Sequence, residues 1–189
     1  MAKLNEINTK DILSAISMGC NAMSSCFNSE DDNIPYFRAI IKPSAFLGIS
    51  LESHMPGRHL NALLNTENAT GINISEEAID NHAKAAFLSY SGALAFPMDR
   101  GPHFSGTQKK PPNVFNPHHI REGFHALYSL AKYRNSQQAE EIAEKSIRDI
   151  TNNWDPITDW DYDGIENSYE IKCEKSKVFV SGLARAIGP

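Results

Sequence analysis

The chain lacks several features that would assign it quickly to a class of protein. Its 189 residues contain no apolar run near the roughly 18–20 residues of a membrane-spanning helix. The three cysteines, Cys20, Cys26 and Cys173, are an odd number without close spacing, so we expect no disulfide framework and interpret them as small buried hydrophobes. Basic residues, 18 in number, are outnumbered by 23 acidic ones, and the formal net charge is −5. The charge argues against a nucleic-acid partner, and the sequence predicts no membrane partner.

Targeting and catalytic signatures are also missing. The start, residues 1–6, has no apolar core and no cleavage site, so the sequence shows no signal peptide and a cytoplasmic location is the default expectation. The Walker loop, GxGxxG, GxSxG and CxxC patterns do not occur. Function must therefore be inferred from the arrangement of elements and from clusters of reactive side chains.

The sequence does contain a series of amphipathic segments separated by polar loops. Apolar spacing and capping signals predict helices over residues 9–27, 56–71, 75–91, 116–134, 137–150 and 175–187. The segment 34–41 is expected to be extended. Two long loops remain, 92–115, rich in glycine and proline, and 151–174, which carries both tryptophans. The fold class predicted is all-α.

The helices recur with a fixed period. Arg58, Arg121 and Arg185 occupy corresponding places in three Leu/Ala-rich segments and lie 63 and 64 residues apart. Each unit is a helix, a short turn, a second helix and a long loop. Such a period is typical of stacked helical hairpins.

Two of these segments carry a family resemblance. The run 56–64 with 66–71 after it, and the block 118–123 through 131–133, resemble hairpins of the six-hairpin glycosidases. These are (α/α)6 toroid enzymes that act on polysaccharides and uronides. The resemblance covers about residues 10–189 and implies that the chain, as one domain over 1–189, is the N-terminal part of a toroid. Six helices make about half of a ring, and the other half would come from the remainder of its own chain or from a second subunit.

The resemblance also implies which residues face the substrate, an oligosaccharide or polysaccharide. Helix starts line the sugar cleft in such toroids, and the residues at the starts of two helices here are His54, Arg58, His59, His118, His119 and Arg121. Helix N-termini and arginine side chains both suit anionic ligands. Trp160 is a candidate for stacking on sugar, as are other loop aromatics such as Tyr36 and Phe37, although such residues also plug the ends of helical cores.

The catalytic residues are chosen by placement. Glycoside hydrolysis needs two carboxylates, or one with a positioned water, and Glu122 and Asp99 are the candidates. The alternative for Glu122 is that it simply pairs with Arg121. The expected function is a glycoside hydrolase acting on an acidic or uronide-containing glycan by carboxylate acid/base catalysis. The alternatives are a polysaccharide lyase or sugar epimerase on the same fold, and a non-catalytic helical-repeat scaffold or calcium-stabilised binding module.

Two metal sites are possible from the sequence. Asp159, Asp161, Asp163 and Glu170 match D-x-D-x-D-G-x5-E, the calcium-loop pattern, and would supply hard oxygen ligands for Ca2+. Glu166 stands where that loop expects an apolar residue, so a solvated acidic hairpin is the alternative. On the fourth predicted helix, residues 118, 122 and 125 share one face and could hold a metal. No other cofactor is expected.

Overall fold

The computed structural model describes residues 11–42, 45–49, 51–101, 103–104 and 110–175. Within these ranges the structure is mostly helical, as predicted, with short strands between the helices. The α-helices are α2 (Ile12–Met23), α3 (Met55–Thr70), α4 (Glu76–Ser89), α5 (Ile120–Arg134), α6 (Gln137–Asn153) and α7 (Tyr162–Tyr169). None of the helices in the described ranges is long and apolar enough to cross a membrane.

Local capping signals explain where the main helices begin and end. Gly71 terminates α3 in the left-handed conformation, with φ of 72°, which glycine adopts at little cost. The hydroxyls of Ser75 and Ser136 accept hydrogen bonds from the backbone N–H groups of Ala78 and Ala139, and so cap α4 and α6. Asn116 caps a 3-10 turn, Pro117–His119, that leads into α5. These boundaries agree with the predicted ones within a few residues.

Two predictions of secondary structure need correction, and a third concerns residues that lie mostly outside the described ranges. The first helix begins after Asp11, whose carboxylate accepts a hydrogen bond from Ser14 N, and ends at Met23 rather than at residue 27. The loop 151–174 contains α7 in addition to short strands. The predicted helix 175–187, with Arg185, lies almost wholly outside the described residues.

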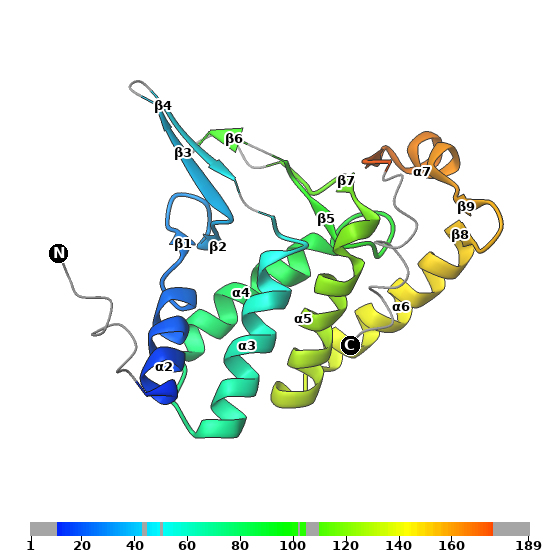
Figure 1. Cartoon of the computed structure of the whole chain (residues 1–189). Helices are drawn as coiled ribbons and strands as arrows, with labels where there is room; N and C mark the ends of the chain where they lie inside the picture. The colour runs from blue at the N-terminus through cyan, green and yellow to red at the C-terminus, as the bar shows by residue number, and fades with distance from the viewer. Residues whose placement is uncertain (1–10, 43–44, 50, 102, 105–109, 176–189) are drawn as a thin grey trace.

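Short strands lie above the N-terminal ends of α3 and α5 (Figure 1). In the extended segment predicted at 34–41, β2 (Ile34–Pro35) pairs with β1 (Phe27–Asn28), and β3 (Arg38–Lys42) pairs with β4 (Ala45–Ile49). A third strand on β4 is β6 (His103–Phe104), and a second sheet has the order β10 (Lys172–Cys173), β7 (Val114–Phe115), β5 (Met98–Asp99). The hairpin β8 (Trp154–Asp155) with β9 (Asp159–Trp160) follows α6.

The helices α3 and α5 lie side by side and run in the same direction (Figure 1). Near their starts Arg58 pairs with Glu122, and near their ends the Tyr133 hydroxyl donates a 2.6 Å hydrogen bond to Asn65 Oδ1. The helices α4 and α6 each return from them through a short turn. The repeat inferred from Arg58 and Arg121 thus corresponds to two parallel helices that start at the same level.

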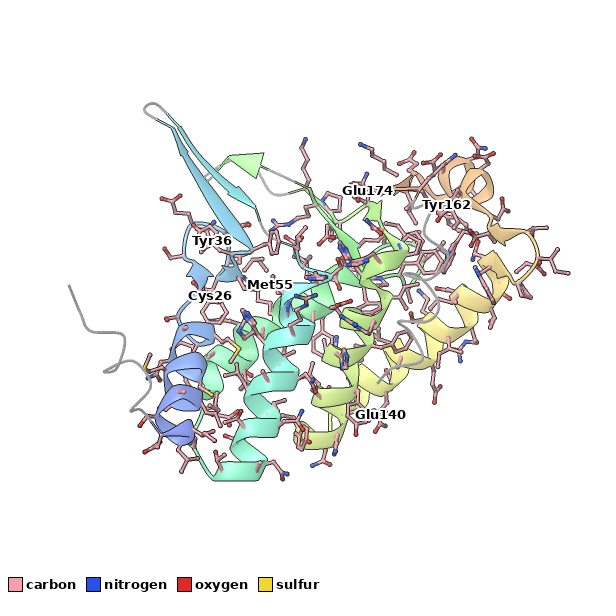
Figure 2. All side chains as sticks on the ribbon, viewed as in Figure 1. Cys26, Tyr36, Met55, Glu140, Tyr162 and Glu174 are labelled. Atoms are coloured by element: carbon pink, nitrogen blue, oxygen red, sulfur yellow. The ribbon has the colours of Figure 1, made fainter. Side chains whose placement is uncertain are left out.

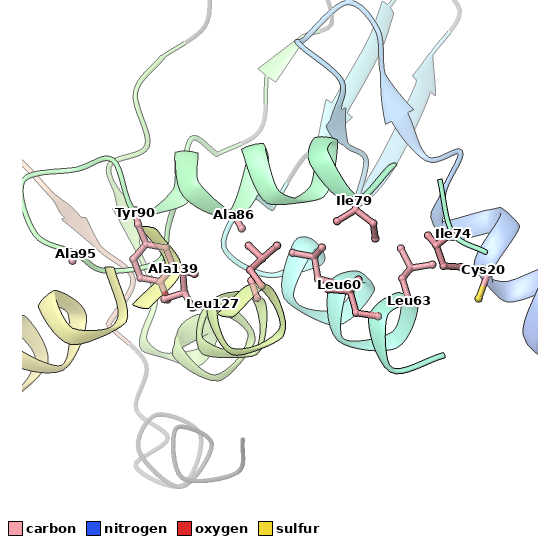
Figure 3. Close-up of a cluster of buried hydrophobic side chains, with 13 residues drawn as sticks. Cys20, Leu60, Leu63, Ile74, Ile79, Ala86, Tyr90, Ala95, Leu127 and Ala139 are labelled. Carbon is pink, nitrogen blue, oxygen red and sulfur yellow. The ribbon is translucent and has the colours of Figure 1, made fainter. Parts of the chain in front are cut away.

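The core lies between α3, α4 and α5 (Figure 3). Its buried members include Leu60, Leu63, Leu64, Ile79, Ala86, Leu127 and Leu130. A second cluster, built on Phe96, Phe115 and Trp160, fills the space under β5, β7 and α7. Because both clusters are tightly packed, they hold the starts of α3 and α5 in fixed positions beneath the strands.

Candidate functional site

The starts of α3 and α5 meet at a glycine. A Cβ added to Gly57 would overlap the backbone carbonyl oxygen of Glu122, so the missing side chain allows the two helices to approach closely. This approach sets His54 and Arg58 beside Glu122 and the residues that precede it. Met55, the first residue of α3, marks the region in Figure 2.

Three histidines gather at this end of the helices. The His54 ring centroid lies 5.0 Å from that of His119 and 6.0 Å from that of His118, with the latter pair stacked. His54 is only 6% exposed, and its buried Nδ1 atom meets no hydrogen-bond partner within the described ranges. Burial, with the nearby Arg58 cation, lowers the pKa of His54 to about 4. The ring is therefore neutral at neutral pH and retains a proton-accepting nitrogen.

Glu122 is fully buried between two arginines. Its Oε1 atom accepts from Arg121 and, at 3.3 Å, from Arg58, while Oε2 has no hydrogen-bond partner among the described residues. Burial alone would raise the pKa of Glu122, but the Arg121 hydrogen bond and the surrounding positive charge outweigh it and hold the pKa below its ordinary value. The predicted pairing with Arg121 is confirmed, and the carboxylate is ionised.

Asp99 positions His119 through a buried hydrogen-bonded group with Ser53. Its Oδ1 accepts from Ser53 N at 3.0 Å and its Oδ2 from Ser53 Oγ at 2.6 Å. Nδ1 of His119 lies 3.0 Å from Asp99 Oδ2 and 2.7 Å from Ser53 Oγ. A neutral ring that donates through Nδ1 carries its lone pair on Nε2. The arrangement therefore fixes the orientation and the tautomer of His119.

A buried ion cluster of Arg100, Asp31 and Glu52 adjoins this group. Arg100 donates from Nη1 and Nη2 to the two Asp31 oxygens, at 3.1 and 2.7 Å, and from Nε and Nη2 to Glu52 Oε1, at 2.8 and 2.6 Å. The three side chains are at most 5% exposed. Glu52 directly precedes Ser53, and Arg100 directly follows Asp99. The cluster therefore anchors the backbone on which Ser53 and Asp99 lie.

The structure brings together most, but not all, of the residues proposed from the sequence. His54, Arg58, His118, His119, Arg121, Glu122 and Asp99 form one contiguous group. His59 does not belong to it, because it lies on another face of α3, next to Cys26 and His82. Ser53, Glu52, Asp31 and Arg100 were missed by the sequence reasoning, since no spacing pattern connects residues so far apart along the chain.

Trp160 does not fit the predicted contact with sugar. It is 7% exposed and packs at right angles to Phe96 and Phe115, at centroid distances of 5.7 and 5.2 Å. This is the alternative role of a loop aromatic, closing one end of a core. Phe37, in contrast, is 44% exposed and lies edge-on to His54 at 6.3 Å, which makes it the aromatic side chain available beside the site.

The geometry of residues 159–170 does not form the predicted calcium loop. Helix α7 occupies most of this segment, Asp161 is used as its N-cap, with Oδ1 accepting from Gly164 N, and Asp163 pairs with Lys175. Along the helix axis, Glu170 is about 13 Å from Asp161, whereas ligands of one Ca2+ each lie within about 2.6 Å of the ion. Asp159 precedes the cap on β9. The carboxylates are therefore spread along a helix, and they do not surround one point.

Comparisons with known proteins assign no family to this arrangement. The chain matches no family model, and it shows no significant similarity to a curated protein or to a solved structure. The functional argument therefore depends on the site itself.

Proposed function

We propose that the protein is a carbohydrate-active enzyme whose substrate is an acidic, uronide-containing glycan, bound at the common N-terminal end of α3 and α5. The observation that carries this proposal is the neutral His54 beside the half-exposed guanidinium of Arg58. One group accepts a proton and the other binds a carboxylate, and a uronide presents an acidic C–H next to its carboxylate.

The arginines supply the charge complementarity for such a substrate. The Arg58 side chain is 52% exposed and the Arg121 side chain 32%, whereas the Glu122 that they share is inaccessible. An exposed guanidinium suits a carboxylate, which it can bind in bidentate geometry. Phe37 lies near enough to His54 to stack on the same sugar ring.

The protonation states favour proton abstraction over carboxylate acid catalysis. A general acid for glycoside hydrolysis needs a raised pKa, so that it carries a proton to donate. The pKa of Glu122 is lowered, and Asp99 is engaged with Ser53 and His119. In an elimination, His54 would take the proton adjacent to the substrate carboxylate, Arg58 would neutralise that carboxylate, and the leaving oxygen would depart with a proton from the protonated His54 or from solvent.

A glycoside hydrolase remains the second candidate, because Asp99 and Glu122 do flank the histidine cluster. In this mechanism the inaccessible Glu122 would hold Arg58 and Arg121 in position for the substrate. The leaving oxygen would take its proton from solvent, and a water would attack the sugar carbon.

The experiment is turnover of uronide-containing oligosaccharides, read in two channels. Elimination generates an unsaturated product that absorbs in the ultraviolet, whereas hydrolysis releases reducing ends without that absorbance. The proposal of elimination expects both signals from wild type and neither from His54→Gln, with the fold intact by circular dichroism. Reducing ends without ultraviolet absorbance support hydrolysis, and no turnover on a panel of acidic glycans supports a non-catalytic scaffold.

We also propose the ring arrangement for the fold, with α3 and α5 as inner helices and α4 and α6 as outer ones. An apolar groove of about 470 Å³ lies between α5 and α6, lined among others by Phe124, Tyr128, Ala143 and Ile147. A further hairpin, from the remainder of the chain or from a second subunit, would fill it. Sedimentation measurements on wild type and on Ile147→Asp test the second-subunit case, which expects a dimer that the substitution dissociates.

A further inference from the structure

A second cluster of reactive side chains lies where α2 ends, away from the histidines of the proposed active site. Cys26 follows α2, His59 is in the second turn of α3, and His82 is in the middle of α4. Each offers one ligand atom, and the three atoms lie within 4.8 Å of one another. Cys26, at the junction between α2 and β1, is labelled in Figure 2.

The two ring nitrogens of His82 differ in their hydrogen bonding. Nε2 lies 3.0 Å from the carbonyl oxygen of Met23, which can only accept, so Nε2 carries the proton. Nδ1 is then an unprotonated acceptor in a side chain that is 0% exposed, and it has no hydrogen-bond partner in the part of the chain that the structure describes. A lone pair buried in this way is costly unless something binds it. A histidine that donates its other N–H to a backbone carbonyl is the usual state of a metal ligand.

The other two donors have a spacing that suits a metal. Sγ of Cys26 lies 3.7 Å from Nδ1 of His59. In a tetrahedral zinc site, with bonds of about 2.3 Å to sulfur and 2.0 Å to nitrogen, these atoms are roughly 3.5 Å apart. One thiolate and two imidazoles form a borderline-soft donor set that favours Zn2+ over Mg2+ or Ca2+.

From this geometry we propose that Cys26, His59 and His82 bind a zinc ion. Cys26 and His59 are partly exposed, so solvent reaches the site and supplies the fourth ligand. Binding releases the thiol proton of Cys26 to solvent, and both histidines bind as neutral rings. The ion links three elements that are otherwise joined mainly through apolar contacts. It stabilises above all the attachment of α2, whose Ile12, Leu13 and Met18 side chains are more than half exposed.

The site is independent of the proposed glycan site. His59 follows Arg58, and consecutive residues on a helix are rotated by about 100°, so the two side chains leave α3 in different directions. Failure of one proposal therefore leaves the other standing.

The test is metal binding by the full chain after removal of metal with a chelator and dialysis. Wild type is expected to bind one equivalent of Zn2+, and Co2+ is expected to give the intense near-ultraviolet absorbance of a cobalt–thiolate bond. Zinc at about a hundredfold excess over Kd should raise Tm by roughly 5 °C or more. In Cys26→Ser the cobalt–thiolate band should vanish and zinc affinity should fall at least about tenfold.

Two further variants make the result decisive. Cys173→Ala removes a different free thiol, in the second core cluster, and should retain the metal and the cobalt band. His59→Ala removes a partly exposed ligand and should weaken zinc binding without loss of fold, which guards against misfolding of a His82 variant. Wild type that retains no Zn2+, or a Cys173→Ala protein that loses the cobalt band as Cys26→Ser does, would overturn the proposal.

Discussion

Gly57 of α3 lies directly against the backbone of Glu122 in α5, with no room for a Cβ between the two helices. This contact determines how closely the two helix starts approach, and hence the distance from Arg58 to the buried carboxylate. The sequence around Gly57 does not indicate this contact, since an isolated glycine at the start of a helix is common. Its importance comes from a residue 65 positions away.

Gly57→Ala should therefore destabilise the protein. The added methyl group forces α3 and α5 apart, and overpacking of this kind costs about 1–3 kcal/mol or more. The free energy of unfolding, measured with urea, is the readout. Gly19→Ala in α2 is the matched control, because a Cβ there meets nothing within 4 Å. On an exposed helix this control should gain roughly 0.5–1 kcal/mol, and equal effects of the two substitutions would contradict the close contact.

Arg100→Leu should be among the most destabilising single substitutions. It leaves Asp31 and Glu52 buried without their shared cation, and breaking a buried ion pair in this way costs about 3–5 kcal/mol. Thermal unfolding measures the loss. Arg148→Leu removes an exposed pair with Glu144 and should change stability by less than about 1 kcal/mol. A small effect at Arg100 would show that the cluster is not a structural anchor.

Stability should fall as the pH decreases from about 6.5 to about 4. His54 and His82 have a folded pKa of about 4, against an ordinary value of 6.5. In this window the unfolded chain binds more protons than the folded one, so stability is complete above pH 6.5 and is lost toward pH 4. The fully buried His82 contributes on the order of 3 kcal/mol over the window, and His54 contributes in the same direction. Urea unfolding at several pH values, with chelator present, measures the slope, which His54→Gln should reduce. A flat profile would contradict neutral burial of these rings.

Arg58→Gln should weaken binding of an acidic substrate more than it slows turnover. Loss of a charge-assisted hydrogen bond to a carboxylate costs about 1.5–3 kcal/mol, which is roughly a 10- to 100-fold increase in KM. Arg121 continues to pair with Glu122, so the site should persist. Steady-state kinetics provide the comparison, with Arg148→Gln as the charge-matched control. An unchanged KM would place the substrate carboxylate elsewhere.

Helices α2 to α6 were predictable because their signals are local. Ser75, Ser136 and Gly71 act on backbone groups within a few residues of themselves. Apart from the extended segment 34–41, the strands were not predictable, because their partners are distant in sequence. Val114, for example, pairs with Lys172, and strands of two residues are too short to show an alternating pattern. Strands this short are specified by the neighbours that they meet after the helices have packed.

The residues of the candidate site were likewise predictable only in part. The period of 63 residues predicted that Arg58 and Arg121 lie at the same level, and the structure places them on either side of Glu122. His59 was assigned to the substrate cleft because it lies near the start of a helix, but its side chain leaves α3 in another direction, next to Cys26 and His82. Ser53 escaped notice because a lone serine carries no signature, and its contact with Asp99 spans 46 residues.

The Arg100 ion cluster also has a mechanical consequence. One guanidinium holds Asp31 on one side of the β3–β4 hairpin and Glu52 on the other, so both ends of the segment between them are fixed to the same point. β4 is held a second time through its pairing with β6, where Leu47 lies opposite Phe104. A single cut of the backbone within the hairpin, for example by trypsin after Lys42, should therefore leave two fragments that stay together under native conditions and separate only in denaturant.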